Sequence, residues 1–179
     1  MTSIIIGIVA GLIVAILFLI WALPTKIRYI ERIEVEAPLE RVYDAIRFQE
    51  QLMAWSAWPS ETNSLCEVKG PDGQIGAQTI YANQKGKQFG YQEITELIPN
   101  ERVSFYLESF VAPFEDEVRL EFILRPISEA STEISLWFDE TLKRPAFLIA
   151  YFGGILKWVH GMHLKDLQGL KTYVEKQAK

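Results

Sequence analysis

An uninterrupted apolar block near the N-terminus constrains this chain more than any other feature. Residues 4–23 are all apolar or glycine. About 20 helical residues span roughly 30 Å, which matches the hydrocarbon core of a bilayer. A secretory signal is the alternative, but the block is longer than a signal core, lacks a basic residue before it and offers a poor cleavage site. We therefore predict a retained membrane anchor, which includes Ile4, Leu12, Phe18, Trp21 and Leu23.

Basic residues flank this block on one side only. Lys26, Arg28 and Arg32 follow it, and no Lys or Arg precedes it. The positive-inside rule then predicts a single-pass membrane protein whose N-terminus lies outside and whose C-terminal part lies in the cytoplasm. We expect two parts, an anchor over residues 1–25 and a globular domain over residues 26–179.

The overall composition excludes several classes of function. The chain has 179 residues and a net charge of -5, so we expect no nucleic-acid partner, because phosphate binding needs a basic face. The single cysteine, Cys66, excludes an internal disulfide and a thiolate metal cage. We expect Cys66 to be a packed thiol, since no nucleophile motif surrounds it.

The pattern after the anchor is strand, short helices, many strands and a long helix. Alternating apolar residues between turn signals predict seven strands, at 30–36, 65–69, 75–82, 88–97, 102–110, 117–125 and about 134–138. Two short helices are expected at 39–48 and 49–55, followed by a loop at 56–60. Hairpin-length connections indicate a mostly antiparallel sheet.

The C-terminal segment predicts a long helix from Pro145 to about Gln177, with Gly153-Gly154 marking a bend or close packing. Its apolar stripe steps by three and four residues and comprises Leu156, Val159, His160, His163, Leu167, Leu170 and Val174. We place Lys157, Lys165, Asp166 and Lys171 mainly on its other faces. A lone helix across a curved sheet gives an α+β fold of two layers.

Three segments resemble the START-like superfamily, also called SRPBCC. They are residues 34–46 (EVEAPLERVYDAI) followed by Trp55, residues 98–103 (IPNERV) and residues 161–171 (GMHLKDLQGLK). The polyketide cyclase/dehydrase-like branch is the most similar group, and the resemblance covers roughly residues 30–176. It implies a helix-grip fold, in which a seven-stranded antiparallel sheet grips the long C-terminal helix over an apolar cavity. The membrane anchor is not part of that family's common domain.

The resemblance also implies a function class without choosing within it. Family members bind lipids, sterols, polyketides and other hydrophobic molecules; some are enzymes and others are partners of chaperones. Aromatic and apolar side chains would line such a cavity, and a filled core without ligand space is the alternative. Our candidate lining residues are Trp55, Trp58, Tyr81, Tyr91, Phe105, Phe122, Trp137, Phe152, Leu156, His160 and His163.

Two further features have both a functional and a structural interpretation. His160 and His163 share one helix face and suit an acid–base pair or two metal ligands, but no third ligand is apparent, so we predict no metal site. Residues 145–152, with Trp58 and Phe114 as companions, either pack on the sheet or touch the membrane beside a cavity mouth. The acidic runs at 115–117 and 139–140 are expected to be solvated turns.

The leading hypothesis is a membrane-anchored START-like domain that binds a hydrophobic small molecule or lipid without catalysis and without a cofactor. The first alternative is a cyclase- or dehydratase-type enzyme that uses the same cavity, with His160 or His163 as its acid or base. The second is a non-catalytic interaction module with an exposed apolar patch and no internal hollow. The sequence assigns no catalytic residue and leaves the oligomeric state open.

Overall fold

A computed structural model describes residues 2–111, 117–144 and 147–176 of the chain. Phe114, Glu115, Asp116, Pro145 and Gln177, which entered the expectations above, lie outside these residues. The helices are α1 (Thr2–Ala22), α2 (Leu39–Arg47), α3 (Gln49–Trp55), α4 (Trp58–Glu61), α5 (Phe147–Phe152) and α6 (Ile155–Lys176). The strands are β1 (Lys26–Val35), β2 (Leu65–Lys69), β3 (Gln78–Ala82), β4 (Gln88–Ile98), β5 (Arg102–Ser109), β6 (Glu117–Ser128) and β7 (Ser131–Thr141).

The strands form one antiparallel sheet in the order β1-β7-β6-β5-β4-β3-β2. Strands β2 to β7 pair with their neighbours in sequence, as hairpin-length connections dictate. Strand β1 forms the edge of the sheet opposite β2 and pairs with β7, where Arg28 is opposite Asp139 and Tyr29 is opposite Phe138. The expected seven-stranded antiparallel sheet is confirmed.

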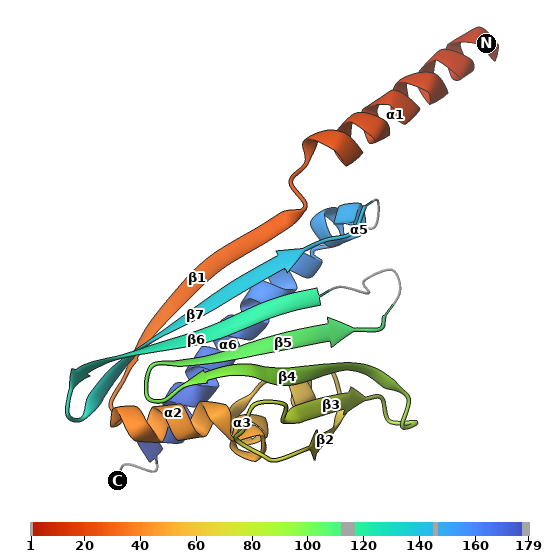
Figure 1. Ribbon diagram of the computed structural model, residues 1–179. Coiled ribbons are helices and arrows are strands. Elements are labelled where there is room, and N and C mark those ends of the chain that lie inside the picture. The colour runs from red at the N-terminus through yellow and green to blue at the C-terminus, as the bar shows by residue number, and fades with distance from the viewer. Residues whose placement is uncertain (1, 112–116, 145–146, 177–179) are drawn as a thin grey trace.

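The long helix α6 lies across one face of the curved sheet, and α2 and α3 lie at one end of that face (Figure 1). Leu167, Leu170 and Val174 of α6 are buried in the same core cluster as the sheet residues Phe122 and Leu136. The predicted helix-grip arrangement is therefore confirmed, and its physical basis is the burial of a helical stripe against an alternating strand face.

Several local boundaries differ from those expected; for example, β6 ends at Ser128 rather than at residue 125, and β7 spans Ser131–Thr141 rather than about 134–138. Strand β1 begins at Lys26 rather than at residue 30, because its pairing with β7 continues to the register pair Lys26–Thr141. Strand β3 begins at Gln78 rather than at residue 75. The expected loop at 56–60 contains the short helix α4, in which Pro59 occupies the first turn, a position that does not require its missing N–H.

The C-terminal helix is divided in two by Gly153-Gly154. Gly154 has a φ of +75°, a conformation that residues with a Cβ rarely adopt, so α5 ends and α6 starts in a new direction. The sequence predicted a bend or close packing within one long helix at these glycines, whereas the structure has two separate helices there.

Helix α1 projects away from the domain (Figure 1) and is long and apolar enough to cross a membrane. None of its strongly apolar window is buried inside the structure. By length and composition alone, a signal sequence near the N-terminus would pass the same test. Its C-terminal end is fastened to the domain, because the guanidinium of Arg144 donates to the carbonyls of Ile20, Trp21 and Leu23.

Candidate functional site

A cavity of about 310 Å³ lies between the sheet and the helices α3 to α6. Its wall is mainly apolar and includes Leu120 and Phe122 of β6, Phe138 of β7 and Leu156 and Val159 of α6. The hollow exists because the helix stripe and the strand face are not in full contact along their length. Its volume is at the lower end of the range of small-molecule sites in proteins.

A buried carboxyl group belongs to the wall of this cavity. The Asp166 side chain on α6 is only 5% exposed. Its Oδ1 accepts hydrogen bonds from the backbone N–H of Ala57 at 2.7 Å and from the hydroxyl of Ser56 at 3.2 Å. Burial raises the pKa of Asp166 to about 6, against the opposing effect of hydrogen bonds from Ala57, Ser56 and Trp58.

A neutral histidine lies one helical turn earlier on the same helix. His163 is 2% exposed, and its Nδ1 shares a hydrogen bond of 2.5 Å with the hydroxyl of Tyr29. The ring of Phe138 lies 4.9 Å from the imidazole centroid, and that of Trp58 lies 6.0 Å away. Burial lowers the pKa of His163 to about 4, with a smaller contribution from His160.

A phenol, that of Tyr81, also belongs to the polar part of the wall, which further includes Ser56, Gln92, Glu108, Ser109 and Glu140. Burial raises the pKa of Tyr81, and the charges of Cys66 and Asp166 raise it further, so Tyr81 stays a neutral hydroxyl. The cavity thus combines an apolar wall with a carboxyl group that exchanges its proton near neutral pH, a neutral imidazole and a phenol. These groups can hydrogen-bond the polar end of an apolar molecule, and the carboxyl and imidazole groups can also transfer protons.

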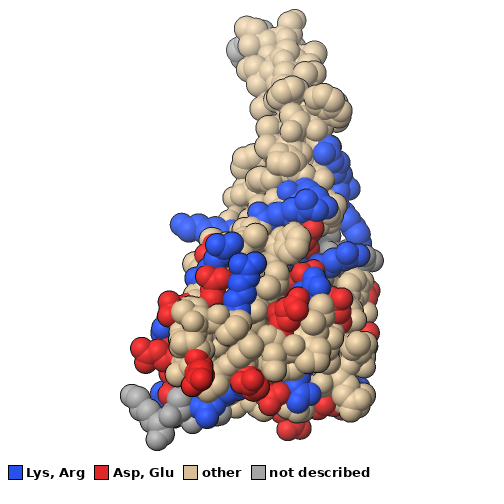
Figure 2. Space-filling view, turned by 60° about the vertical axis from the view of Figure 1, so that its left-hand side comes forward, with Lys and Arg blue, Asp and Glu red and all other residues tan. Residues whose placement is uncertain are grey.

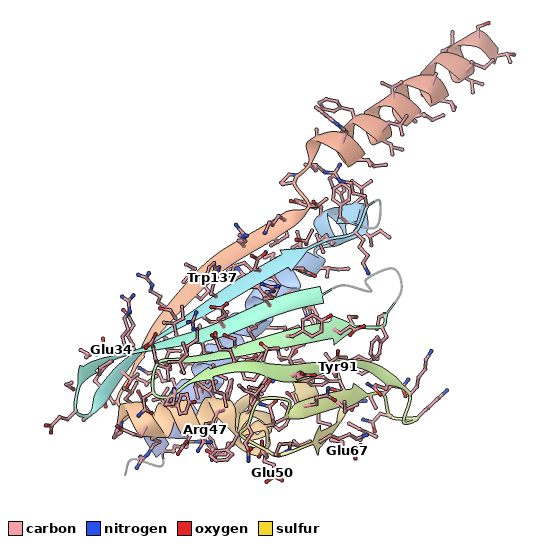
Figure 3. The ribbon with its side chains drawn as sticks, viewed as in Figure 1. Glu34, Arg47, Glu50, Glu67, Tyr91 and Trp137 are labelled. Atoms are coloured by element: carbon pink, nitrogen blue, oxygen red, sulfur yellow. The ribbon has the colours of Figure 1, made fainter. Side chains whose placement is uncertain are left out.

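Seven of the eleven predicted residues contribute to the cavity wall. They are Trp55, Trp58, Tyr81, Tyr91, Phe122, Leu156 and His163. Tyr91 is a special case, because its neighbours Gly90 and Gln92 are buried while its own hydroxyl donates to Glu108 at 2.8 Å. Alternation along β4 directs its ring to the outer face of the sheet, where Figure 3 labels it together with Trp137.

The other four predicted residues do not line the cavity. Phe105 is buried in the core and packs edge-on against Phe122. Trp137 alternates with the buried Leu136 and Phe138 and lies exposed on the outer face. Phe152 is exposed on α5, and Nε2 of His160 lies 2.7 Å from the carboxylate of Glu31. The two histidines therefore have different surroundings, although they share a helix face.

Asp166 was not among the predicted cavity residues, because its position was assigned mainly to the outer faces of the helix. A signal was present, because Asp166 is three residues after His163 and four before Leu170 and therefore continues the apolar stripe. Gln92 was also missed; its amide donates to Oε1 of the buried Gln49 at 3.0 Å, and the Thr79 hydroxyl donates to the same oxygen at 2.9 Å.

The described residues contain no group of three His, Cys, Asp or Glu side chains that could hold a metal ion. His160 faces Glu31, and His163 faces Tyr29, so the two imidazoles serve separate partners.

A family model described as "Activator of Hsp90 ATPase homolog 1-like protein" matches residues 36–146. This match supports the expected START-like superfamily and gives a narrower family description than the resemblance did. The matched segment ends before α6, so Asp166 and His163 lie outside it. A search of curated proteins found no match.

Solved structures show the same fold at low sequence identity. A protein from Chromobacterium violaceum is 20% identical with a TM-score of 0.58, covering 86% of this chain and 99% of that one. The Aha1 dimer from Colwellia psychrerythraea is 19% identical with a TM-score of 0.55, covering 83% and 96%. Norcoclaurine synthase from Thalictrum, in complex with a transition-state analogue, is 11% identical with a TM-score of 0.63, covering 86% and 97%.

Proposed function

Since the chain belongs to the family of Activator of Hsp90 ATPase homolog 1-like proteins, we propose that it is a membrane-anchored domain that binds a hydrophobic small molecule or lipid between the sheet and α6. The observation that carries the proposal is the apolar cavity of about 310 Å³ with Asp166, His163 and Tyr81 at its wall. Apolar burial would supply most of the binding energy, and these three groups would orient a polar end.

The size of the cavity favours a compact occupant. A volume at the lower end of the usual range suits one small hydrophobic molecule better than a complete two-chain lipid. The fold is compatible with this use, because norcoclaurine synthase, which has a similar structure, was solved in complex with a transition-state analogue. That likeness supports a small-molecule site in this chain without naming its ligand.

The anchor part of the proposal rests on α1 and its basic flank. An apolar helix of 21 residues has no buried residue, and it contacts the described domain only near its C-terminal end, so a bilayer is the natural solvent for the rest of it. We propose a single span over residues 1–25, with the domain of residues 26–179 on the cytoplasmic side, because Lys26, Arg28 and Arg32 follow the span.

The binding proposal is tested by mass spectrometry of molecules that copurify with the full chain in detergent. A Leu156→Trp variant fills the cavity and should lose the bound compound. Leu164→Trp is the matched control, because Leu164 is an exposed leucine on the same helix and does not line the cavity. A wild-type protein that carries no apolar compound, or a Leu156→Trp variant that keeps it, would contradict binding in this cavity.

A second candidate function is an enzyme that works in the same cavity. It is favoured by the pKa of about 6 for the Asp166 carboxyl beside the neutral His163, because perturbed ionisable groups in a cavity are typical of acid–base sites. Incubating the copurified compound with the protein should then convert it, and Asp166→Asn should retain binding but lose conversion. The interaction-module alternative is disfavoured by the hollow itself, which that hypothesis did not expect.

A further inference from the structure

We propose that α5 and the basic residues around the base of α1 form a membrane-docking face, and that the cavity receives its ligand from the bilayer through this face. The docking face consists of Lys26, Arg28, Arg144, Ile149 and Phe152. The inference rests on the proposed membrane anchor and cavity. It adds two points: the partner of this face is a bilayer that contains anionic lipids, and the ligand enters the cavity from that bilayer.

Helix α5 lies against the point at which the chain would leave the bilayer. Phe147 and Ala150 of α5 form a small buried cluster with Leu142, and Ile20 and Leu23 pack against it. The hydroxyl of Tyr151 donates to the carbonyl of Pro24 at 2.9 Å. Since these contacts join α5 to the C-terminal end of α1, a membrane that holds α1 must pass close to α5.

The two sides of α5 differ in their surroundings. Phe147 and Ala150 are buried, whereas Ile149 is 52% exposed and Phe152 is 71% exposed. Two large apolar side chains beside a membrane anchor find favourable surroundings at the boundary of headgroups and acyl chains. We infer that this side of α5 lies in the lipid interface.

Charge complementarity identifies the lipid. Figure 2 shows Lys and Arg gathered directly below α1, whereas Asp and Glu lie mainly farther from it, in a chain whose net charge is -5. Lys26 and Arg28 share one carboxylate, Asp139, at 3.7 and 2.8 Å, so this group keeps a net positive charge. Arg144 bonds to uncharged carbonyls and keeps its whole charge. Such a juxtamembrane cluster attracts anionic headgroups.

The cavity wall includes residues that are sequence neighbours of this docking face. Ala150 of α5 and Ile155 and Leu156 of α6 line the cavity, and Ile155 and Leu156 also pack on the cluster that contacts α1. The break at Gly153-Gly154, where Gly154 has a φ of +75°, lies between Ala150 and Ile155. An apolar molecule could then pass from lipid into the cavity without crossing water.

The test places a fluorescent probe at Phe152. The full chain with Cys66→Ser and Phe152→Cys is labelled with an environment-sensitive dye and reconstituted in phosphatidylcholine vesicles, with or without phosphatidylserine. We expect the emission of the dye at residue 152 to shift to the blue in the vesicles. We also expect its fluorescence to be quenched by lipids that carry nitroxide groups near the headgroup, and more strongly so when phosphatidylserine is present. Ile127→Cys is the matched control, because Ile127 is 54% exposed near the β6–β7 turn, far from α1 (Figure 1).

Equal fluorescence of the probes at residues 152 and 127 would overturn the docking face, even if the protein still copurified with a cavity ligand. Quenching at residue 152 that does not depend on phosphatidylserine would overturn the proposed attraction between the basic residues and anionic headgroups. The path is tested by Phe152→Asp, which should slow the uptake of an apolar fluorophore from vesicles, whereas Ile127→Asp should not. Failure of the proposed function has a different signature, namely an inserted residue 152 together with an empty cavity.

Discussion

Asp166 and His163 show how burial acts in opposite directions on an acid and a base. Burial disfavours the charged form of each, so the pKa of Asp166 rises to about 6 while that of His163 falls to about 4. Both side chains are therefore largely neutral near pH 5, and at neutral pH the Asp166 carboxylate lies in an apolar wall. Hydrogen bonds from Ser56 and Ala57 reduce this penalty without removing it.

Asp166→Asn tests this electrostatic account. A carboxyl whose pKa is higher in the folded chain than its usual 3.8 binds its proton more tightly when folded. Its contribution to stability is full below pH 3.8 and is lost as the pH rises through about 6, to an extent of about 3 kcal/mol. Asparagine has no such titration and still accepts a hydrogen bond from Ala57.

We therefore expect the free energy of unfolding of Asp166→Asn, relative to wild type, to rise between pH 4 and pH 7.5 by roughly that amount. Urea unfolding of the full chain in detergent at both pH values measures it. Taking the difference between Asp166→Asn and wild type at each pH cancels the contribution of the other titrating groups. If this difference in the free energy of unfolding were the same at both pH values, the raised pKa of Asp166 would be contradicted.

At the scale of elements, the position of α6 is set by its close contact with α3. Gly169 faces the backbone of Trp55, and a Cβ at position 169 would overlap the Trp55 carbonyl oxygen. Trp55 is itself held in place, because its indole N–H donates to the Ala45 carbonyl at 2.9 Å. This close approach brings Asp166 within hydrogen-bond distance of the residues that follow Trp55, so one glycine positions a polar group of the cavity.

Gly169→Ala should destabilise the protein by about 1–3 kcal/mol, because the added methyl group must displace backbone rather than a flexible side chain. Gly161→Ala on the same helix is the matched control: no atom lies within 4 Å of its added Cβ. There alanine should stabilise by roughly 0.5–1 kcal/mol through helix propensity. Thermal unfolding of both variants measures these changes in stability. Equal effects of the two substitutions would rule out the close contact between Gly169 and the Trp55 backbone.

At the scale of the whole molecule, the chain combines an exposed apolar helix with a domain whose cavity lies near the base of that helix. Arg144 and Tyr151 join the two parts through hydrogen bonds to the carbonyls of residues 20–24. Only three residues, Leu23 to Thr25, separate α1 from β1, so the anchor would hold the domain close to the bilayer surface. A ligand taken from lipid would then have a short path.

Retention of the anchor is a direct prediction. The expressed chain should stay in membranes after alkaline carbonate washing and keep its full mass of 20.5 kDa, because an anchor is not cleaved. Protease should digest the domain only when it reaches the cytoplasmic face, as the basic flank requires. A shortened, released protein would identify α1 as a secretory signal, and digestion from the opposite side would reverse the orientation.

The sequence by itself determined the fold class, because alternation along strands and the three-to-four spacing along a helix report which side of each element is buried. Seven strands, the long C-terminal helix and the bend at Gly153-Gly154 followed from these local patterns and from turn residues. The apolar length of residues 4–23 likewise identified α1, since that property needs no neighbour. The resemblance of short motifs then pointed to a helix-grip domain, which the structure confirms.

Only the tertiary structure decided which side chains meet at the cavity. Periodicity identifies a face, but a hollow depends on the distance between elements, so Phe105 fills the core while Phe122 reaches the cavity wall. Periodicity also cannot distinguish the surroundings of His160 from those of His163, because their partners, Glu31 and Tyr29, belong to β1, which is far from α6 in the sequence. Asp166 was missed for the same reason: a charged residue is buried only where folding supplies donors, and Ser56 and Ala57 do so from the other end of the domain's sequence.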